Sequence, residues 1–151
     1  MEYIIGIDPG AKGAAIILNK KGQLRLCLEF NKLTSHEIAT TLRVFKRQKV
    51  LKGNTCRAII EKVHSLQPAG KVANFGFGRN FGLIEGILAA LRIPYDFVTP
   101  QKWQKAMKCM SKGDKKITRA KAQQLYPDEK ITHTTADAFL IARYGCDFYS
   151  L

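Results

Sequence analysis

The chain has 151 residues and a mass of 16.9 kDa, which is the usual size of one domain with a hydrophobic core of its own. Its hydrophobic content of 46% and charged content of 25% are those of a globular protein and exclude a disordered or collagen-like chain. Lys and Arg number 25 against 12 Asp and Glu, so the net charge is +13. This excess predicts a polyanionic partner, with nucleic acid favoured over an anionic membrane.

The sequence also predicts where the protein works. No apolar run approaches the ~20 residues of a membrane span, and the first five residues lack the basic start of a signal peptide. Cys27, Cys56, Cys109 and Cys146 are scattered without a Cys-x-x-Cys pair, which is typical of reduced thiols and not of a zinc site or disulfide framework. We expect no membrane partner and a cytoplasmic or nucleoid location in a bacterial or phage-infected cell, with an organelle matrix as the alternative.

The first half of the chain predicts three strands in a meander, then a helix and a fourth strand. Apolar runs and alternation place strands over residues 3–8, 14–18, 24–30 and 58–61, with a hairpin turn at 19–22. Ser35 is the expected N-cap of the intervening helix, whose apolar residues recur at helical spacing.

The second half predicts alternating helix and strand, and then helices alone. A glycine-bearing segment over 67–82 leads into a helix over 80–91, and a strand follows over 93–98. Further helices are expected from Pro100, over 115–125, and from Thr134 to Tyr144, with Gly145 as the last C-cap. The order predicts a single α/β domain over residues 1–151, with a five-stranded mixed sheet flanked by helices.

Three carboxylates stand in apolar surroundings. Asp8 and Glu61 each end a buried strand, where open α/β sheets place their ligands, and Asp137 lies within an apolar helix. A carboxylate in such a place is costly unless it is paired or bound to a cation. Hard oxygen ligands favour Mg²⁺ or Mn²⁺, and together with a basic surface they predict two-metal phosphodiester hydrolysis.

Each of the three carboxylates also has a purely structural interpretation. Asp8, before a Pro-Gly pair, could bond its own backbone in a turn. Glu61, next to a lysine, could face solvent at the end of its strand. Asp137 could close a capping box that begins at Thr134.

Ordered motifs along the chain add a more specific signal. Gly6-Ile7-Asp8-Pro9-Gly10 with Gly13, then Ile59-Ile60-Glu61-Lys62-Val63, then His133-x-x-Ala136-Asp137-Ala138 resemble motifs of the RuvC-type Holliday junction resolvases. Residues 74–76, 81–86, 98–103 and 142–145 are similar to the short RuvC-like resolvases of bacteriophages and organelles in particular. The resemblance covers nearly the whole chain, in order.

The resemblance implies an RNase H-like fold and a homodimer that nicks a DNA four-way junction symmetrically. It implies two Mg²⁺ or Mn²⁺ ions per active site, with Asp8 bridging both and Glu61 and Asp137 holding one each. One ion would activate the attacking water and the other would stabilise the leaving 3′ oxygen.

The sequence departs from the family at a fourth acidic position, usually found three to five residues before the last Asp. Residues 132–134 are not acidic here, and His133 is the candidate for this role as a ligand or general base. A histidine at a helix start is also often a capping or surface residue. Asp128 or Glu129 could substitute for it.

A basic stretch provides candidate phosphate contacts. Residues 102–121 contain eight Lys or Arg against Asp114 alone, without the interleaved Glu typical of a solvated helix face. By analogy with the family, Lys102 and Lys116 could lie near the metal site. The candidate contacts are Lys102, Lys105, Lys112, Lys115, Lys116 and Arg119.

The segment after Glu61 is expected to approach the junction centre. His64, Phe75 and Phe77 could stack on an unpaired base, while Lys71 and Arg79 would contact phosphates. The aromatic residues could equally be core or dimer contacts.

A neighbouring helix is the candidate dimer contact. For Phe81 we favour a place in the core or at a dimer contact. The helix over 80–91 corresponds to the family's dimer helix, where Gly82 and Gly86 would give a smooth face.

The sequence therefore predicts a metal-dependent endonuclease that resolves Holliday junctions as a homodimer. Two alternatives stay open. One is an RNase H-like nuclease on other branched DNA or on RNA–DNA hybrids, and the other is a junction-binding protein with impaired catalysis.

Overall fold

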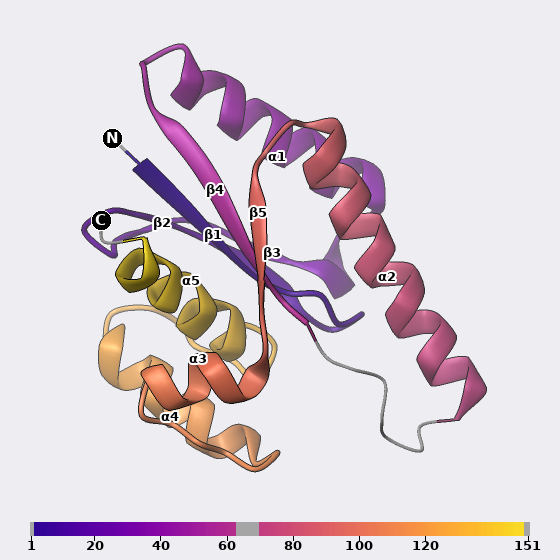
Figure 1. The fold of residues 1–151 in the computed structure, drawn as a ribbon, viewed down its shortest axis with the longest axis vertical. Coiled ribbons are helices and arrows are strands. Elements are labelled where there is room, and N and C mark those ends of the chain that lie inside the picture. The colour runs from indigo at the N-terminus through magenta and orange to yellow at the C-terminus, as the bar shows by residue number, and fades with distance from the viewer. Residues whose placement is uncertain (1, 63–69, 150–151) are drawn as a thin grey trace.

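The sheet has five strands with one antiparallel and one parallel half. A computed structural model describes residues 2–62 and 70–149 of the chain (Figure 1). The strands lie in the order β3-β2-β1-β4-β5, in which β1 pairs antiparallel with β2 and parallel with β4. The elements are β1 (Glu2–Asp8), β2 (Ala14–Asn19), β3 (Leu24–Glu29), η1 (Phe30–Lys32), α1 (Ser35–Val50), β4 (Thr55–Glu61), α2 (Lys71–Ala90), β5 (Tyr95–Val98), α3 (Pro100–Ala106), α4 (Lys115–Leu125) and α5 (Ala136–Phe148). The predicted mixed-sheet α/β fold is confirmed.

Helices cover both faces of the sheet, with α1 and α2 on one side and α3, α4 and α5 on the other (Figure 1). The alternation of β1 supplies both cores, because successive side chains of a strand point to opposite faces. Tyr3, Ile5 and Ile7 pack with α1 and α2, whereas Ile4 packs with α5. The odd and even positions of β1 therefore determine which helices each residue meets.

α5 lies directly on the backbone of β1. A Cβ at Gly6 would overlap the backbone of Ala138 and Ala142, so only glycine permits this approach. Gly145 serves the same contact, since a Cβ there would lie 2.6 Å from Ile4 Cγ2. The prediction that Gly145 ends the helix is wrong, because its missing side chain makes room for the sheet and α5 continues to Phe148.

α1 begins one residue away from the predicted cap. Thr34, and not Ser35, is the N-cap: its hydroxyl accepts from Glu37 N at 3.2 Å, and its own N–H donates to Glu37 Oε2 at 2.7 Å. Thr34 is favoured over Ser35 as the N-cap because Glu37 lies three residues after it and completes a reciprocal capping box.

α2 begins earlier than predicted, and this corrects the glycine-bearing loop. The segment from Lys71 onward is already helical, including Gly76 and Gly78, despite a cost of about 1 kcal/mol per interior glycine. Burial of Ile84 and Leu88 against the sheet anchors the helix at its far end. Although α2 has 20 residues, neither it nor any other helix in the described part is long and apolar enough to cross a membrane.

Candidate active site

Two carboxylates meet at the carboxyl edge of the parallel strands. Ile7 of β1 pairs with Ile60 of β4, so Asp8 and Glu61 come next on neighbouring strands. By strand alternation, Asp8 shares the face of Ile4, and Glu61 shares that of Ile59. This is the face that α5 covers.

The third carboxylate comes from the first turn of α5 on the same face. Asp137 is 6% exposed and Glu61 is 8% exposed, so the solvent-facing interpretation of Glu61 is wrong. Mutual repulsion shows that the three groups are close, since both Asp8 and Asp137 raise the pKa of Glu61. The structure thus brings together three side chains that are widely separated in the sequence.

Asp8 both shapes its turn and faces this edge. Its Oδ1 accepts from the backbone N–H of Gly10 at 3.1 Å, as the turn interpretation expects. Burial raises the pKa of Asp8, while the Gly10 N–H and the charge of Lys115 oppose the rise. Asn80 of α2 fixes the same turn, because its Nδ2 donates to the carbonyls of Pro9 at 2.6 Å and Gly10 at 3.0 Å.

Glu61 is held by a buried indole that the sequence did not single out. Trp103 is fully buried and donates its Nε1–H to Glu61 Oε1 at 2.8 Å. Burial and the charge of Asp8 raise the pKa of Glu61 to about 7, against the lowering effect of the Trp103 hydrogen bond. A signal was present, because Thr99 as N-cap and Pro100 as first helical residue place Trp103 one turn into α3.

Asp137 is not a helix cap. Thr135 is the N-cap of α5 and makes no side-chain capping bond, so the alternative interpretation of Asp137 as part of a capping box is wrong. Asp137 Oδ2 instead accepts from the ammonium of Lys115. Its Oδ1 is buried and has no hydrogen-bond partner among the described residues. A buried carboxylate oxygen without a partner is costly and is a natural cation ligand.

Lys115 is the cation at this edge. Burial lowers the pKa of Lys115, but the charge and hydrogen bond of Asp137, followed by the charges of Asp8 and Glu61, raise it overall, so the ammonium stays charged. The sequence favoured Lys102 and Lys116 for a place near the site. The structure instead puts Lys102 Nζ over the ring of Phe148, at the other end of α5 from Asp137.

His133 lies beside the carboxylate edge. With Asp8, Lys115 and other residues it lines a cavity of about 330 Å³, and it is itself exposed. Asp128 and Glu129, the alternatives to His133, line a separate groove. Of the three candidates for the missing fourth acidic role, the structure brings His133 to this cavity.

The carboxylates have the ligand chemistry that a hard divalent cation needs, but they are not arranged as a metal site in the protein alone. Within residues 2–62 and 70–149, no group of three or more His, Cys, Asp or Glu side chains has the arrangement of a metal site. The donors are nevertheless all hard oxygens, Asp137 Oδ1 has no partner, and the three charges repel one another. A divalent cation would relieve both the repulsion and the unpartnered oxygen.

The candidate DNA contacts occupy two exposed surfaces. Lys71, Phe75 and Arg79 follow one another at four-residue spacing on one face of α2, with Phe75 73% exposed. Lys116 and Arg119 line a cavity of about 440 Å³ with His133. Lys102, Lys105 and Lys112 are exposed along α3 and the following loop.

Two further aromatic candidates are His64 and Phe81. His64 lies outside the described residues. Phe81 stacks on Phe97 with ring centroids 5.8 Å apart and packs against the core beneath α2, as favoured from the sequence.

The strand order and the acidic carboxyl edge define an RNase H-like fold. Among solved structures, the chain is similar to Thermus thermophilus RuvC in complex with a Holliday junction substrate, with a TM-score of 0.64 and 14% identity over 99% of this chain and 95% of that one. A second structure of Thermus thermophilus RuvC gives a TM-score of 0.57 and 15% identity over 98% and 95% of the two chains. A scan of protein-family models and a search of curated sequences give no match. The fold is therefore that of RuvC.

Proposed function

We propose that this protein is a structure-selective endonuclease that resolves four-way DNA junctions by paired, symmetric nicks. The observation that carries the proposal is the meeting of Asp8, Glu61 and Asp137 at the carboxyl edge of a RuvC-like sheet, with Asp137 Oδ1 buried and unpartnered. The basic surface around the edge, with Lys116 and Arg119 beside His133, suits the phosphates of a polyanionic substrate.

Each residue of the edge has a role in this proposal. Asp8, Glu61 and Asp137 would hold two Mg²⁺ or Mn²⁺ ions, which supply activation of the attacking water and stabilisation of the leaving 3′ oxygen. Trp103 orients Glu61 through its 2.8 Å hydrogen bond and is a positioning residue. His133 would take the proton of the attacking water on an imidazole nitrogen. Lys115 balances negative charge through its ion pair with Asp137.

A homodimer would place two such sites on opposed strands of one junction. The outer face of α2 is the proposed contact, because Gly82 and Gly86 leave it open: a Cβ added at either meets nothing within 4 Å. The neighbouring Val72 and Phe75 are 87% and 73% exposed and supply apolar surface or a stacking platform.

The sequence motifs favour a relationship with the short phage and organellar resolvases. The proposed place of action is therefore the cytoplasm, the nucleoid or an organelle matrix.

A cleavage assay tests the proposal. A labelled mobile four-way junction is compared with linear duplex of the same sequence and with an RNA–DNA hybrid, in Mg²⁺ and in Mn²⁺. We expect paired nicks at symmetric positions in the junction alone, and loss of nicking with retained junction binding in Asp8→Asn.

Glu2→Gln is the matched control, because it removes one negative charge from the opposite end of β1. It should cut as the wild type does. Cleavage of the hybrid in preference to the junction would replace this proposal with a general RNase H-like nuclease. Tight junction binding without cutting in either metal would leave a junction-binding protein with impaired catalysis.

A further inference from the structure

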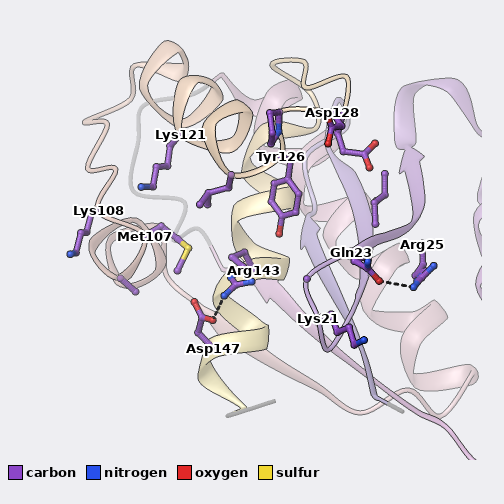
Figure 2. A pocket seen from close by; sticks show the side chains of 16 residues that line it. Lys21, Gln23, Arg25, Met107, Lys108, Lys121, Tyr126, Asp128, Arg143 and Asp147 are labelled. Atoms are coloured by element: carbon purple, nitrogen blue, oxygen red, sulfur yellow. Dashed lines mark hydrogen bonds and ion pairs between the residues drawn. The ribbon is translucent and has the colours of Figure 1, made fainter.

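A second concave site lies away from the carboxylate edge. It is a groove of about 720 Å³ between the β2–β3 turn, the α3–α4 linker, the end of α4 and the outer side of α5 (Figure 2). The β2–β3 turn is at the opposite end of β1 from Asp8, because Tyr3 pairs with Asn19 whereas Asp8 pairs with Ala14. Asp128 and Glu129, the two alternatives to His133, line this groove, whereas Asp8, Glu61, Asp137 and His133 do not, and we call it the distal groove.

The wall of the distal groove has an apolar part, and one buried polar atom of a wall residue has no partner among the described residues. Leu24, Met107 and Leu125 supply apolar contacts beside the ring of Tyr126, which is fixed from behind by Phe139 at a centroid distance of 5.0 Å. Tyr126 is 9% exposed, and its hydroxyl has no hydrogen-bond partner among the described residues. Burial raises the pKa of Tyr126, so this hydroxyl stays protonated and can both donate and accept.

Cations from separate elements converge on the same groove. Lys108 and Lys121 are drawn on one side of it, and Lys21 comes from the turn opposite (Figure 2). Arg143 is held in place at the centre by an ion pair with Asp147 at 3.0 Å and by the close approach of Gly22, whose φ of +77° turns the hairpin onto it. Several cations on one concave surface suit a phosphate group.

Carboxylates on another side limit the kind of anion. Asp128 and Glu129 also line the groove, and Figure 2 shows Tyr126 between Asp128 and the lysines. These carboxylates would repel a second phosphate there but would accept hydrogen bonds from sugar hydroxyls or exocyclic amines. The volume of the groove, about 720 Å³, is that of a small-ligand site.

We propose that the distal groove binds a single nucleotide unit, with the base on the apolar wall at Tyr126 and the phosphate at Lys108 and Lys121. The unit can come from a free nucleoside monophosphate or from an unpaired DNA strand, since both present the same chemistry. The site is separate from the carboxylate edge and does not depend on the proposed cleavage.

The test is a titration followed by backbone amide NMR, without divalent metal. The probes are deoxyadenosine monophosphate, deoxyadenosine, inorganic phosphate and a single-stranded hexadeoxyadenylate. We expect the monophosphate or the hexamer to shift Gly22, Lys108 and Arg143 amides and to bind at least about tenfold more tightly than phosphate or the nucleoside, because neither alone fills both halves of the groove. Binding of the hexamer alone would assign the nucleotide to a strand, and binding of the monophosphate would assign it to a free ligand.

Two variants with a matched control complete the test. Lys108→Glu and Lys121→Glu, which reverse the two charges assigned to the phosphate, should each weaken binding by about tenfold. Lys20→Glu carries the same charge change next to Lys21 but does not line the groove, and it should bind as the wild type does.

The proposal is overturned if inorganic phosphate binds as tightly as the nucleotide probes, or if neither nucleotide probe binds more tightly than about 10 mM. It is also overturned if the shifts map to the start of α4, or if Lys20→Glu weakens binding as much as Lys121→Glu. Junction cleavage plays no part in this readout, so a failure here does not touch the proposed function.

Discussion

Replacing Glu61 with glutamine should stabilise the metal-free protein above neutral pH. The carboxyl group of Glu61 is 8% exposed, and burial together with repulsion from Asp8 raises its pKa from 4.5 to about 7. The folded state therefore holds a proton more tightly than the unfolded state does. The contribution of Glu61 to stability is therefore most favourable below pH 4.5, falls as the pH rises through 7, and levels off above it.

The size of this effect follows from the shift in pKa. A difference of one pKa unit corresponds to 1.36 kcal/mol, so the shift of Glu61 costs the folded protein about 3 kcal/mol at pH 8. Glu61→Gln removes the charge but keeps an oxygen that accepts from Trp103 Nε1. Its free energy of unfolding should match the wild type near pH 4.5 and exceed it by about 3 kcal/mol at pH 8.

Urea unfolding followed by circular dichroism in EDTA, at pH 5 and at pH 8, measures this difference. Glu2→Gln, at the other end of β1 and partly exposed, is the control and should leave the pH dependence unchanged. Two results would refute the claim that the site disfavours the charge of Glu61. One is the same pH dependence of stability in Glu61→Gln and the wild type, and the other is a Glu61→Gln protein that is less stable than the wild type at pH 8.

Three further predictions concern other elements of the structure. Lys115→Met should lower the free energy of unfolding of the metal-free protein by about 1–2 kcal/mol in urea melts at pH 8, because Asp137 loses its partner. The effect is limited because the lysine is half exposed. Equal stability would show that the ion pair contributes nothing. Gly82→Ala should raise the thermal midpoint by a few degrees, because a Cβ there meets nothing within 4 Å and alanine favours the helix by about 1 kcal/mol. Gly82→Arg should instead shift a dimer toward monomer in light scattering. An unchanged dimer in Gly82→Arg would exclude this face of α2 as the dimer contact. Gly145→Val should lower the free energy of unfolding by at least about 2 kcal/mol through its overlap with Ile4, and a neutral effect would contradict the close packing of α5 on the sheet.

The positions of two site residues could be predicted from sequence because they depend on local rules. Strand alternation and the carboxyl edge of a parallel pair are enough to place Asp8 and Glu61 together. The start of α2 could not be predicted in this way, because Gly76 and Gly78 disfavour a helix locally. The cost is met by burial of Ile84, farther along the same helix, which is a tertiary effect.

The partners of the site residues depend on how distant helices pack. Lys115 stands 22 residues before Asp137, and their ion pair exists only because the start of α4 meets the start of α5. Trp103 reaches Glu61 across 42 residues of sequence for a similar reason. From the sequence, Lys115 is a plausible surface residue and Trp103 a plausible core residue. The sequence does not give their distances in space from Asp137 and Glu61.

The two oxygens of Asp137 have different surroundings, which bears on the proposed metal site. Oδ2 accepts from the Lys115 ammonium, so the three carboxylates are partly neutralised in the protein alone. Oδ1 is buried on the same group and has no partner among the described residues, so it is available to a second cation while the ion pair persists. Lys115 then lowers the repulsion that Asp8 and Glu61 would otherwise suffer in the metal-free state, and it need not leave for a metal ion to bind. If the proposed metal binds, Asp137 would be shared between Lys115 and a divalent cation, although the described residues do not have the arrangement of a metal site in the protein alone.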